Sequence, residues 1–223
     1  HPLRKFSKER TQKEIEFLVE ELDAKIIWIL TSCINMSQEI FDEIIEIIQS
    51  FEEDVAFNIH IRPDSLSFDM IDKLRDIEVD MRFDAGLQTI NEKAMENINR
   101  RNKLKELPEK LERLDGENID ITLDLMHGIP DDNFFLFMNS LKFAVNLPVD
   151  YVRSFRLNIL PGTELWERTD ELEITCEKDI GSSRVLSSRG FPSHEIEKAG
   201  VFSKNIINEH ELGKIKTKES SKF

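Results

Sequence analysis

Five short polar stretches recur along the sequence, each directly after an apolar run typical of a buried strand. They carry hydroxyl, thiol, amide, imidazole, guanidinium and carboxylate groups, which donate and accept hydrogen bonds or transfer protons. The stretches are residues 31–35, 60–64, 84–89, 124–131 and 158–163. In α/β folds, ligands bind at the carboxyl ends of the strands. Five such ends in succession therefore predict one shared binding site.

The elements that would position these residues alternate between two periodicities. β-Branched and apolar runs predict strands at 26–30, 55–59, 79–83, 119–125 and 151–159. Helical spacing predicts helices at 11–22, 38–50, 67–75, 91–99, 103–114 and 132–145. Helices between short buried strands indicate parallel βαβ units, so the fold class is α/β. The pattern alone leaves a doubly wound sheet and part of a (β/α) barrel open.

The amino-acid composition limits which partners and which cellular compartment we expect for this protein. The 223 residues hold 30 basic and 44 acidic side chains, a formal net charge of −14, which disfavours nucleic acid as a partner. No apolar run approaches the roughly 20 residues that span a bilayer, so we expect no membrane association. Two cysteines, Cys33 and Cys176, cannot form a disulfide scaffold, and we expect a cytoplasmic protein.

The regular pattern decays after residue 170. We therefore predict two parts, a core at 1–170 and a small C-terminal extension at 171–223 with a helix at 194–207 and a frayed tail at 214–223. His194 and His210 lie in this extension without a cluster of other ligands, so no metal site is predicted.

Four motifs in the core resemble those of one family. Gly86-Leu87-Gln88-Thr89 followed by Asn99-Arg100 resembles a "GLQS…NR" signature, and the segment from Asp124 to Pro130 resembles a "DLIxGLP" strand. The segment from Leu160 to Leu165 resembles an "LPGTxL" turn, and the segment from Arg4 to Ile15 resembles the helix after a cluster loop. Together they resemble the radical SAM superfamily, in the branch with cobalamin-dependent members, methylthiotransferases and anaerobic coproporphyrinogen oxidases. The resemblance covers about residues 4–170 and implies a partial (β/α)6 TIM-like barrel with parallel strands.

The resemblance also implies cofactors. Family members bind S-adenosylmethionine (SAM) and a [4Fe-4S] cluster held by a CxxxCxxC loop, and some also use cobalamin. This sequence has no such loop, and a cluster needs three or four suitable ligands. The chain as written is therefore expected neither to assemble the cluster nor to cleave SAM. It would be a piece of a longer protein that begins downstream of the loop, a chain with further residues, or a degenerate relative.

Motif positions imply a set of SAM-binding residues: Ser32, Cys33, His60, Gln88, Arg100, Asp124 and Gly128. By resemblance, Gln88 and Asp124 would contact the ribose, and Arg100 would pair with the methionine carboxylate. The competing interpretations are a turn cap for Gln88, a solvated helix end for Arg100 and a buried carboxylate bonded to backbone for Asp124.

Three further residues, Asn35, Arg62 and His127, are candidates to face the substrate, and a histidine packed at a strand exit is the favoured alternative for His127. The catalytic residues stay unassigned. The first functional hypothesis is a radical SAM enzyme core that generates a 5′-deoxyadenosyl radical or supports cobalamin-dependent methyl transfer on a small-molecule or peptide substrate. The second is a non-catalytic SAM- or partner-binding module, whose exposed barrel edge would pair with another chain.

Overall fold

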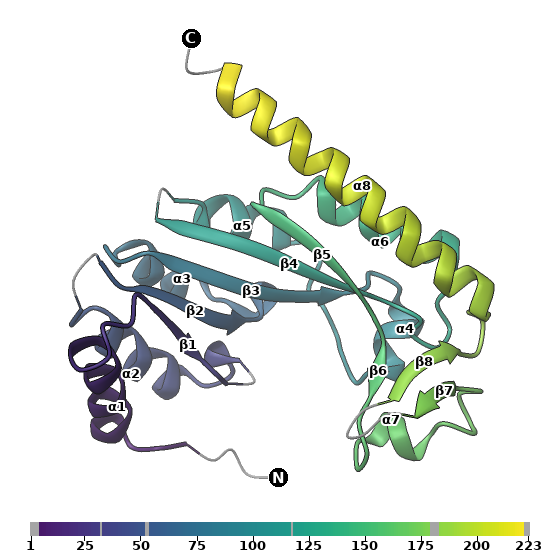
Figure 1. Cartoon of the computed structure of the whole chain (residues 1–223), viewed down its shortest axis with the longest axis horizontal. Helices are drawn as coiled ribbons and strands as arrows, with labels where there is room; N and C mark the ends of the chain where they lie inside the picture. Colours follow the sequence, from purple (N-terminus) through teal and green to yellow (C-terminus); the bar gives the residue numbers. More distant parts are fainter. Residues whose placement is uncertain (1–4, 32, 52–53, 117, 179–182, 221–223) are drawn as a thin grey trace. The chain divides into compact units, whose positions relative to one another are not determined.

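The computed structural model describes residues 5–31, 33–51, 54–116, 118–178 and 183–220, the last eight of these by their backbone alone. The described chain forms two compact units. Figure 1 labels their helices and strands. The first unit comprises His1–Gly86 and Lys105–Thr122, and the second comprises Leu87–Leu104 and Leu123–Phe223.

The first unit alternates helices with strands. Its elements are α1 Lys8–Glu20, β1 Ile26–Ile29, η1 Ile34–Met36, α2 Gln38–Ile48, β2 Ala56–Ile61, η2 Pro63–Ser65, α3 Phe68–Arg75, most of β3 Met81–Gln88, α5 Leu107–Leu114 and the start of β4 Ile119–His127. Serines fix the starts of α1, α2 and α3. The hydroxyls of Ser7, Ser37 and Ser67 accept hydrogen bonds from the backbone N–H groups three residues later, as N-caps do.

The strands β1 to β5 form one parallel sheet in sequential order. In the first unit, β1 pairs in parallel with β2, and β2 pairs in parallel with β3. Alternate residues point to opposite faces of a sheet. One face carries Phe57, Ile59 and Phe83, which are at most 1% exposed. The buried side chains of the helices, such as Ile71 and Leu111, complete this apolar core.

The second unit adds a smaller sheet and a long helix. Its elements are α4 Glu92–Asn97, the end of β4, α6 Phe134–Val145, β5 Tyr151–Arg156, β6 Asn158–Ile159, α7 Glu164–Glu167, β7 Thr175–Lys178, β8 Ser183–Ser187 and α8 Ser193–Ser220. The strands β6, β8 and β7 form an antiparallel sheet in that order. α8 packs on α6 and β5 through buried residues that include Ile196, Ala199 and Ser203.

The predicted fold class, an α/β partial (β/α)6 barrel with parallel strands, is confirmed. Several local predictions differ from the structure: the strand predicted at 79–83 runs from Met81 to Gln88, and β7 and β8 were not predicted. The strand predicted at 151–159 is divided at Leu157, whose N–H donates to the His127 carbonyl (2.9 Å) while its carbonyl accepts from Val185 (3.0 Å). The helix predicted at 194–207 extends to Ser220, so most of the tail predicted to fray is helical. The division of the chain at residue 170 stays a prediction.

Among the residues that the structure describes, no helix combines the length and the apolar character needed to span a bilayer.

Candidate functional site

The predicted site residues divide between the two units. Cys33, Asn35, His60 and Arg62 belong to the first unit, whereas Gln88, Arg100, Asp124, His127 and Gly128 belong to the second. Ser32 lies outside the described residues.

Gln88 ends β3 in a backbone conformation that non-glycine residues seldom adopt. Its φ is +69°, in the left-handed region. Its side-chain Oε1 is buried, and no described residue donates a hydrogen bond to it. Buried polar atoms in native proteins almost always have a partner, supplied by protein, water or a ligand. Gln88 therefore offers an acceptor suited to a ligand hydroxyl or N–H group.

Arg100 is linked to the backbone on both sides of Gln88. Its Nε donates to Oδ1 of Asn102 (2.9 Å). The Asn102 amide Nδ2 in turn donates to the carbonyls of Leu87 (2.8 Å) and Thr89 (3.2 Å). The structure thus brings Gln88 and Arg100 together, with Asn102 as the link. Sequence reasoning missed Asn102, although its place two residues after Arg100 was visible.

A buried polar cluster fixes the turn that follows Gln88. The Thr89 hydroxyl is fully buried and lies 3.2 Å from Ser140 Oγ and 3.3 Å from Asp132 Oδ2. Burial raises the pKa of Asp132 above its ordinary value. The Asn91 amide Nδ2 donates to the Asp131 carbonyl (2.9 Å), which joins this turn to the loop after β4.

Asp124 on β4 is held by an arginine from the next strand. Arg153 donates from Nε to Oδ1 (2.7 Å) and from a terminal nitrogen to Oδ2 (3.0 Å), a bidentate pair. This pair fixes the orientation of the Asp124 carboxylate. A SAM-binding role for Asp124 stays a prediction, and Arg153 was not predicted.

The residues at the end of β4 pack against α8. Gly128 has φ +92°, and a Cβ there would lie 3.2 Å from Ile196 Cδ1, so both conformation and close packing require glycine. The His127 side chain is buried, with Nδ1 3.0 Å from Ser154 Oγ and its ring against Phe137. Burial, reinforced by the charge of Arg156, lowers the pKa of His127 to about 4. This environment is that of a histidine packed at a strand exit.

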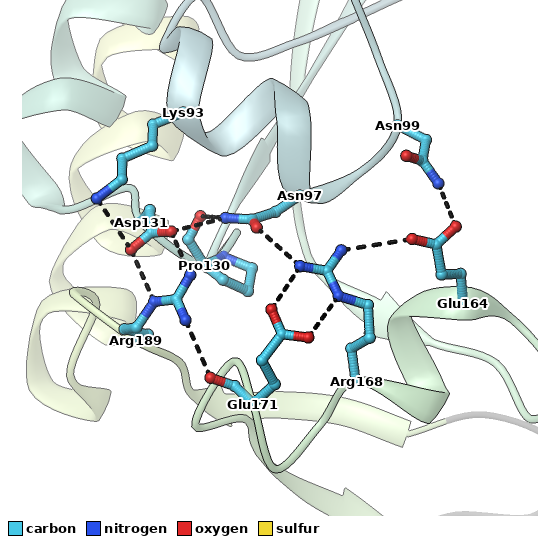
Figure 2. A network of polar contacts seen from close by, with 9 residues as sticks. All are labelled: Lys93, Asn97, Asn99, Pro130, Asp131, Glu164, Arg168, Glu171 and Arg189. Carbon is cyan, nitrogen blue, oxygen red and sulfur yellow. Dashed lines mark hydrogen bonds and ion pairs between the residues drawn. The ribbon is translucent and has the colours of Figure 1, made fainter.

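A polar network, shown in Figure 2, ties the segment before Arg100 to the C-terminal region of the second unit. Arg189 makes a bidentate pair with Asp131 (2.9 and 2.6 Å), and this pairing lowers the pKa of Asp131 to about 2. Asn97 Nδ2 donates to the Pro130 carbonyl (3.0 Å) and to Asp131 Oδ2 (2.9 Å).

The same network extends through Arg168, which makes a bidentate pair with Glu171 (2.9 and 2.8 Å) and donates to Asn97 Oδ1 (3.5 Å). Asn99 donates to Glu164. Asn97 and Asn99 directly precede Arg100, so contacts from residues 164–189 hold the segment that carries it. Sequence reasoning found none of these pairings. Apart from the Arg168–Glu171 pair, each joins residues more than 30 positions apart in the chain.

In the first unit, the structure brings three candidates together. The Asn35 amide donates to the Arg62 carbonyl (2.8 Å) and accepts from the Arg62 N–H (2.9 Å), while the Cys33 thiol donates to Asn35 Oδ1 (2.7 Å). Asn35 is buried, so it joins the segments that follow β1 and β2. His60 lies apart from this cluster, with its Nε2 3.8 Å from Asp84 Oδ2.

The described residues fit some of the cofactors that the motifs imply better than others. SAM fits in part, because Gln88 presents a buried acceptor next to a tethered arginine. A [4Fe-4S] cluster does not fit, because the whole sequence holds two cysteines and the described residues contain no group of three or more His, Cys, Asp or Glu side chains arranged for a metal ion.

The solved structures with a similar fold include two radical SAM enzymes. Coproporphyrinogen III oxidase (HemN) from Escherichia coli, a radical SAM enzyme, superposes with a TM-score of 0.62 at 15% identity, covering 93% of this chain and 48% of that one. The radical SAM methyltransferase TsrM from Kitasatospora setae gives a TM-score of 0.62 at 12% identity over 75% of this chain and 32% of that one. These superpositions confirm the fold that the motifs imply.

Among curated proteins, the chain is similar to heme chaperones. HemW from Bacillus subtilis is 27% identical over 183 residues, which cover 76% of this chain and 48% of HemW. HemW from Buchnera aphidicola of Acyrthosiphon pisum is 21% identical over 154 residues, covering 68% of this chain and 41% of HemW. The chain spans about half the length of these relatives or less. No protein-family model matches it.

Proposed function

We propose that this chain is the SAM-binding core of a radical SAM protein that acts on a small-molecule or peptide substrate. The observation that carries the proposal is the buried, unpartnered acceptor of Gln88 among the described residues, next to an arginine held by Asn102. Gln88 would accept from a ribose hydroxyl, and Arg100 would pair with the methionine carboxylate. Bound SAM would supply the reactive adenosyl or methyl group.

The proposal also includes the other residues predicted to bind SAM or the substrate, and the cellular compartment of the protein. Asp124, Gly128, His60, Cys33 and Ser32 are included as SAM-binding residues on the strength of their motif positions. Asn35, Arg62 and His127 are included as substrate-facing residues because they stand in the polar stretches at the ends of the predicted strands. We place the protein in the cytoplasm, in keeping with its two cysteines.

Partner pairing at the barrel edge is also part of the proposal. β1 lies at one end of the strand order, and its residues Ile26 and Trp28 are 45% and 57% exposed. An exposed apolar edge strand is a template for pairing with another strand.

The test is SAM binding by the protein expressed from its complete gene. Gln88→Ala and Arg100→Ala are each expected to weaken SAM binding at least tenfold, a loss of roughly 1.4 kcal/mol. Gln49→Ala and Arg75→Ala remove an exposed glutamine and an exposed arginine of the first unit and serve as matched controls. Affinity measured by calorimetry that is the same in all four variants would contradict the proposal. The same titration with heme and cobalamin tests the ligands named for HemW and TsrM.

A further inference from the structure

Three side chains form a row across one face of the sheet in the first unit. The strand register places Trp28 opposite Asn58, and Asn58 opposite Arg82. Residues opposite one another in a sheet point to the same face, and here that face is the one away from Phe57, Ile59 and Phe83. We call Trp28, Asn58 and Arg82 the sheet-face row.

The side-chain oxygen of the middle residue lacks a hydrogen-bond donor among the described residues. Asn58 is 8% exposed, and its Oδ1 is buried with no donor among the described residues. An unsatisfied buried acceptor is rare in native proteins because it loses its bonds to water without replacement. We therefore expect a ligand at this face to donate a hydrogen bond, from an N–H or O–H group, to Asn58 Oδ1.

The two outer residues of the row indicate which other chemical groups the ligand carries. Trp28 is 57% exposed and offers an aromatic surface for stacking. Arg82 is exposed and carries the planar guanidinium that pairs with carboxylates. Two strand spacings separate the backbones of Trp28 and Arg82, about 10 Å. A flat ring with a polar N–H and a carboxylate would engage all three side chains.

The same face carries two further residues nearer to the carboxyl ends of the strands. Two residues towards the carboxyl ends of β2 and β3, His60 lies opposite Asp84 on the same face. In parallel α/β sheets ligands bind at these ends. A ligand on the sheet-face row would share this face with His60 and Asp84, which lie nearer to those ends.

We propose that the sheet-face row binds an aromatic carboxylate whose ring N–H donates to Asn58 Oδ1, whose ring stacks on Trp28 and whose carboxylate pairs with Arg82. This inference goes beyond SAM binding, and none of the three residues is among the SAM-binding candidates. Failure of this inference would therefore not contradict the proposed SAM binding, and failure of SAM binding would not contradict this inference.

The test uses indole-3-acetate as the probe, because it combines a flat ring, a ring N–H and a carboxylate. Calorimetric titration of the protein expressed from its complete gene is expected to give saturable binding. Asn58→Leu, Trp28→Leu and Arg82→Leu should each weaken this binding at least fivefold, while Arg75→Leu, which removes an exposed arginine of α3, should leave it unchanged. SAM affinity should stay the same in all variants.

A second probe separates the roles within the row. 3-Methylindole lacks the carboxylate, so Arg82→Leu should leave its affinity unchanged while Asn58→Leu weakens it. Absence of saturable indole-3-acetate binding by the wild-type protein overturns the inference, as does equal affinity in Asn58→Leu and Arg75→Leu. Circular dichroism shows whether Asn58→Leu folds. If it does not, the test rests on Arg82→Leu, which changes an exposed residue, and an unchanged affinity for indole-3-acetate in that variant overturns the inference.

Discussion

Asn58 in the first unit and Asn97 in the second unit are the same residue type and are equally buried, each 8% exposed. Asn97 uses its whole amide: Nδ2 donates to Pro130 and Asp131, and Oδ1 accepts from Arg168. Asn58 Oδ1 has no donor among the described residues. Burial alone therefore does not separate a residue that stabilises the fold from one that awaits a ligand. The hydrogen-bond partners of the side-chain polar atoms distinguish the two cases.

The surroundings of the two asparagines differ in the same way. Around Asn97, the side chains of Asp131, Arg189, Arg168 and Glu171 form two bidentate pairs, and Asp131 has φ +62° (Figure 2). A left-handed residue of this kind persists when its neighbours hold it in place. The flanks of Asn58 are instead an exposed tryptophan and an exposed arginine. In the second unit these polar side chains bond to one another, whereas in the sheet-face row the Asn58 Oδ1 has no donor among the described residues.

The largest expected effect comes from Asn97→Leu. The change removes three hydrogen bonds and leaves the Pro130 carbonyl buried without a donor, so we expect a loss of about 3 kcal/mol in the free energy of unfolding. Urea denaturation measures it, with Asn208→Leu on the exposed side of α8 as the control. A loss equal to that of the control would mean that the network of Figure 2 does not stabilise the second unit.

A smaller, pH-dependent effect is expected at Asp131. Its pKa is lowered to about 2 in the folded protein by Arg189, whereas an unfolded aspartate titrates near 3.9. The stabilisation is therefore complete above the unfolded pKa and is lost as the pH falls from about 4 towards 2. Asp131→Asn should cost about 2 kcal/mol at pH 6. The gap between the wild-type and variant unfolding free energies should shrink below pH 4, and a constant gap would exclude the ion pair as its source.

The smallest effect should have the opposite sign. Asn58→Leu replaces an unsatisfied amide by an apolar side chain of similar size, which removes a desolvation penalty, so we expect the free energy of unfolding to rise by about 1 kcal/mol. The same urea experiment compares it with Asn97→Leu. A destabilisation as large as that of Asn97→Leu would show that Asn58 is bonded within the fold, and the contrast between the two asparagines would fail.

Local chemistry made much of the fold predictable. A serine cap followed by an apolar stripe identified the helix that begins at Gln38, and β-branched runs identified β1 and β2 within one or two residues. β7 and β8 were missed because the stretch around Gly181 has turn-forming residues, while these strands depend on pairing with each other and with β6.

The candidate site was only partly predictable for the same reason. The motifs identified Gln88 and Arg100, but Asp131 pairs with Asn97 and Arg189, which lie 34 and 58 residues away in sequence. Nothing local specifies such partners. Asn58 did leave a local signal, an amide between Phe57 and Ile59 in an otherwise apolar strand, but the absence of a partner required the three-dimensional structure.

The division into two units has a consequence for how the protein can be cut or recombined. The chain passes from one unit to the other three times, after Gly86, after Leu104 and after Thr122. β3 and β4 each contribute residues to both units, because the crossings at 86 and 122 fall inside them. Neither unit corresponds to a contiguous stretch of coding sequence. A single proteolytic cut between residues 87 and 122 leaves each unit dependent on both fragments. An exchange of one unit between homologous genes requires three breakpoints.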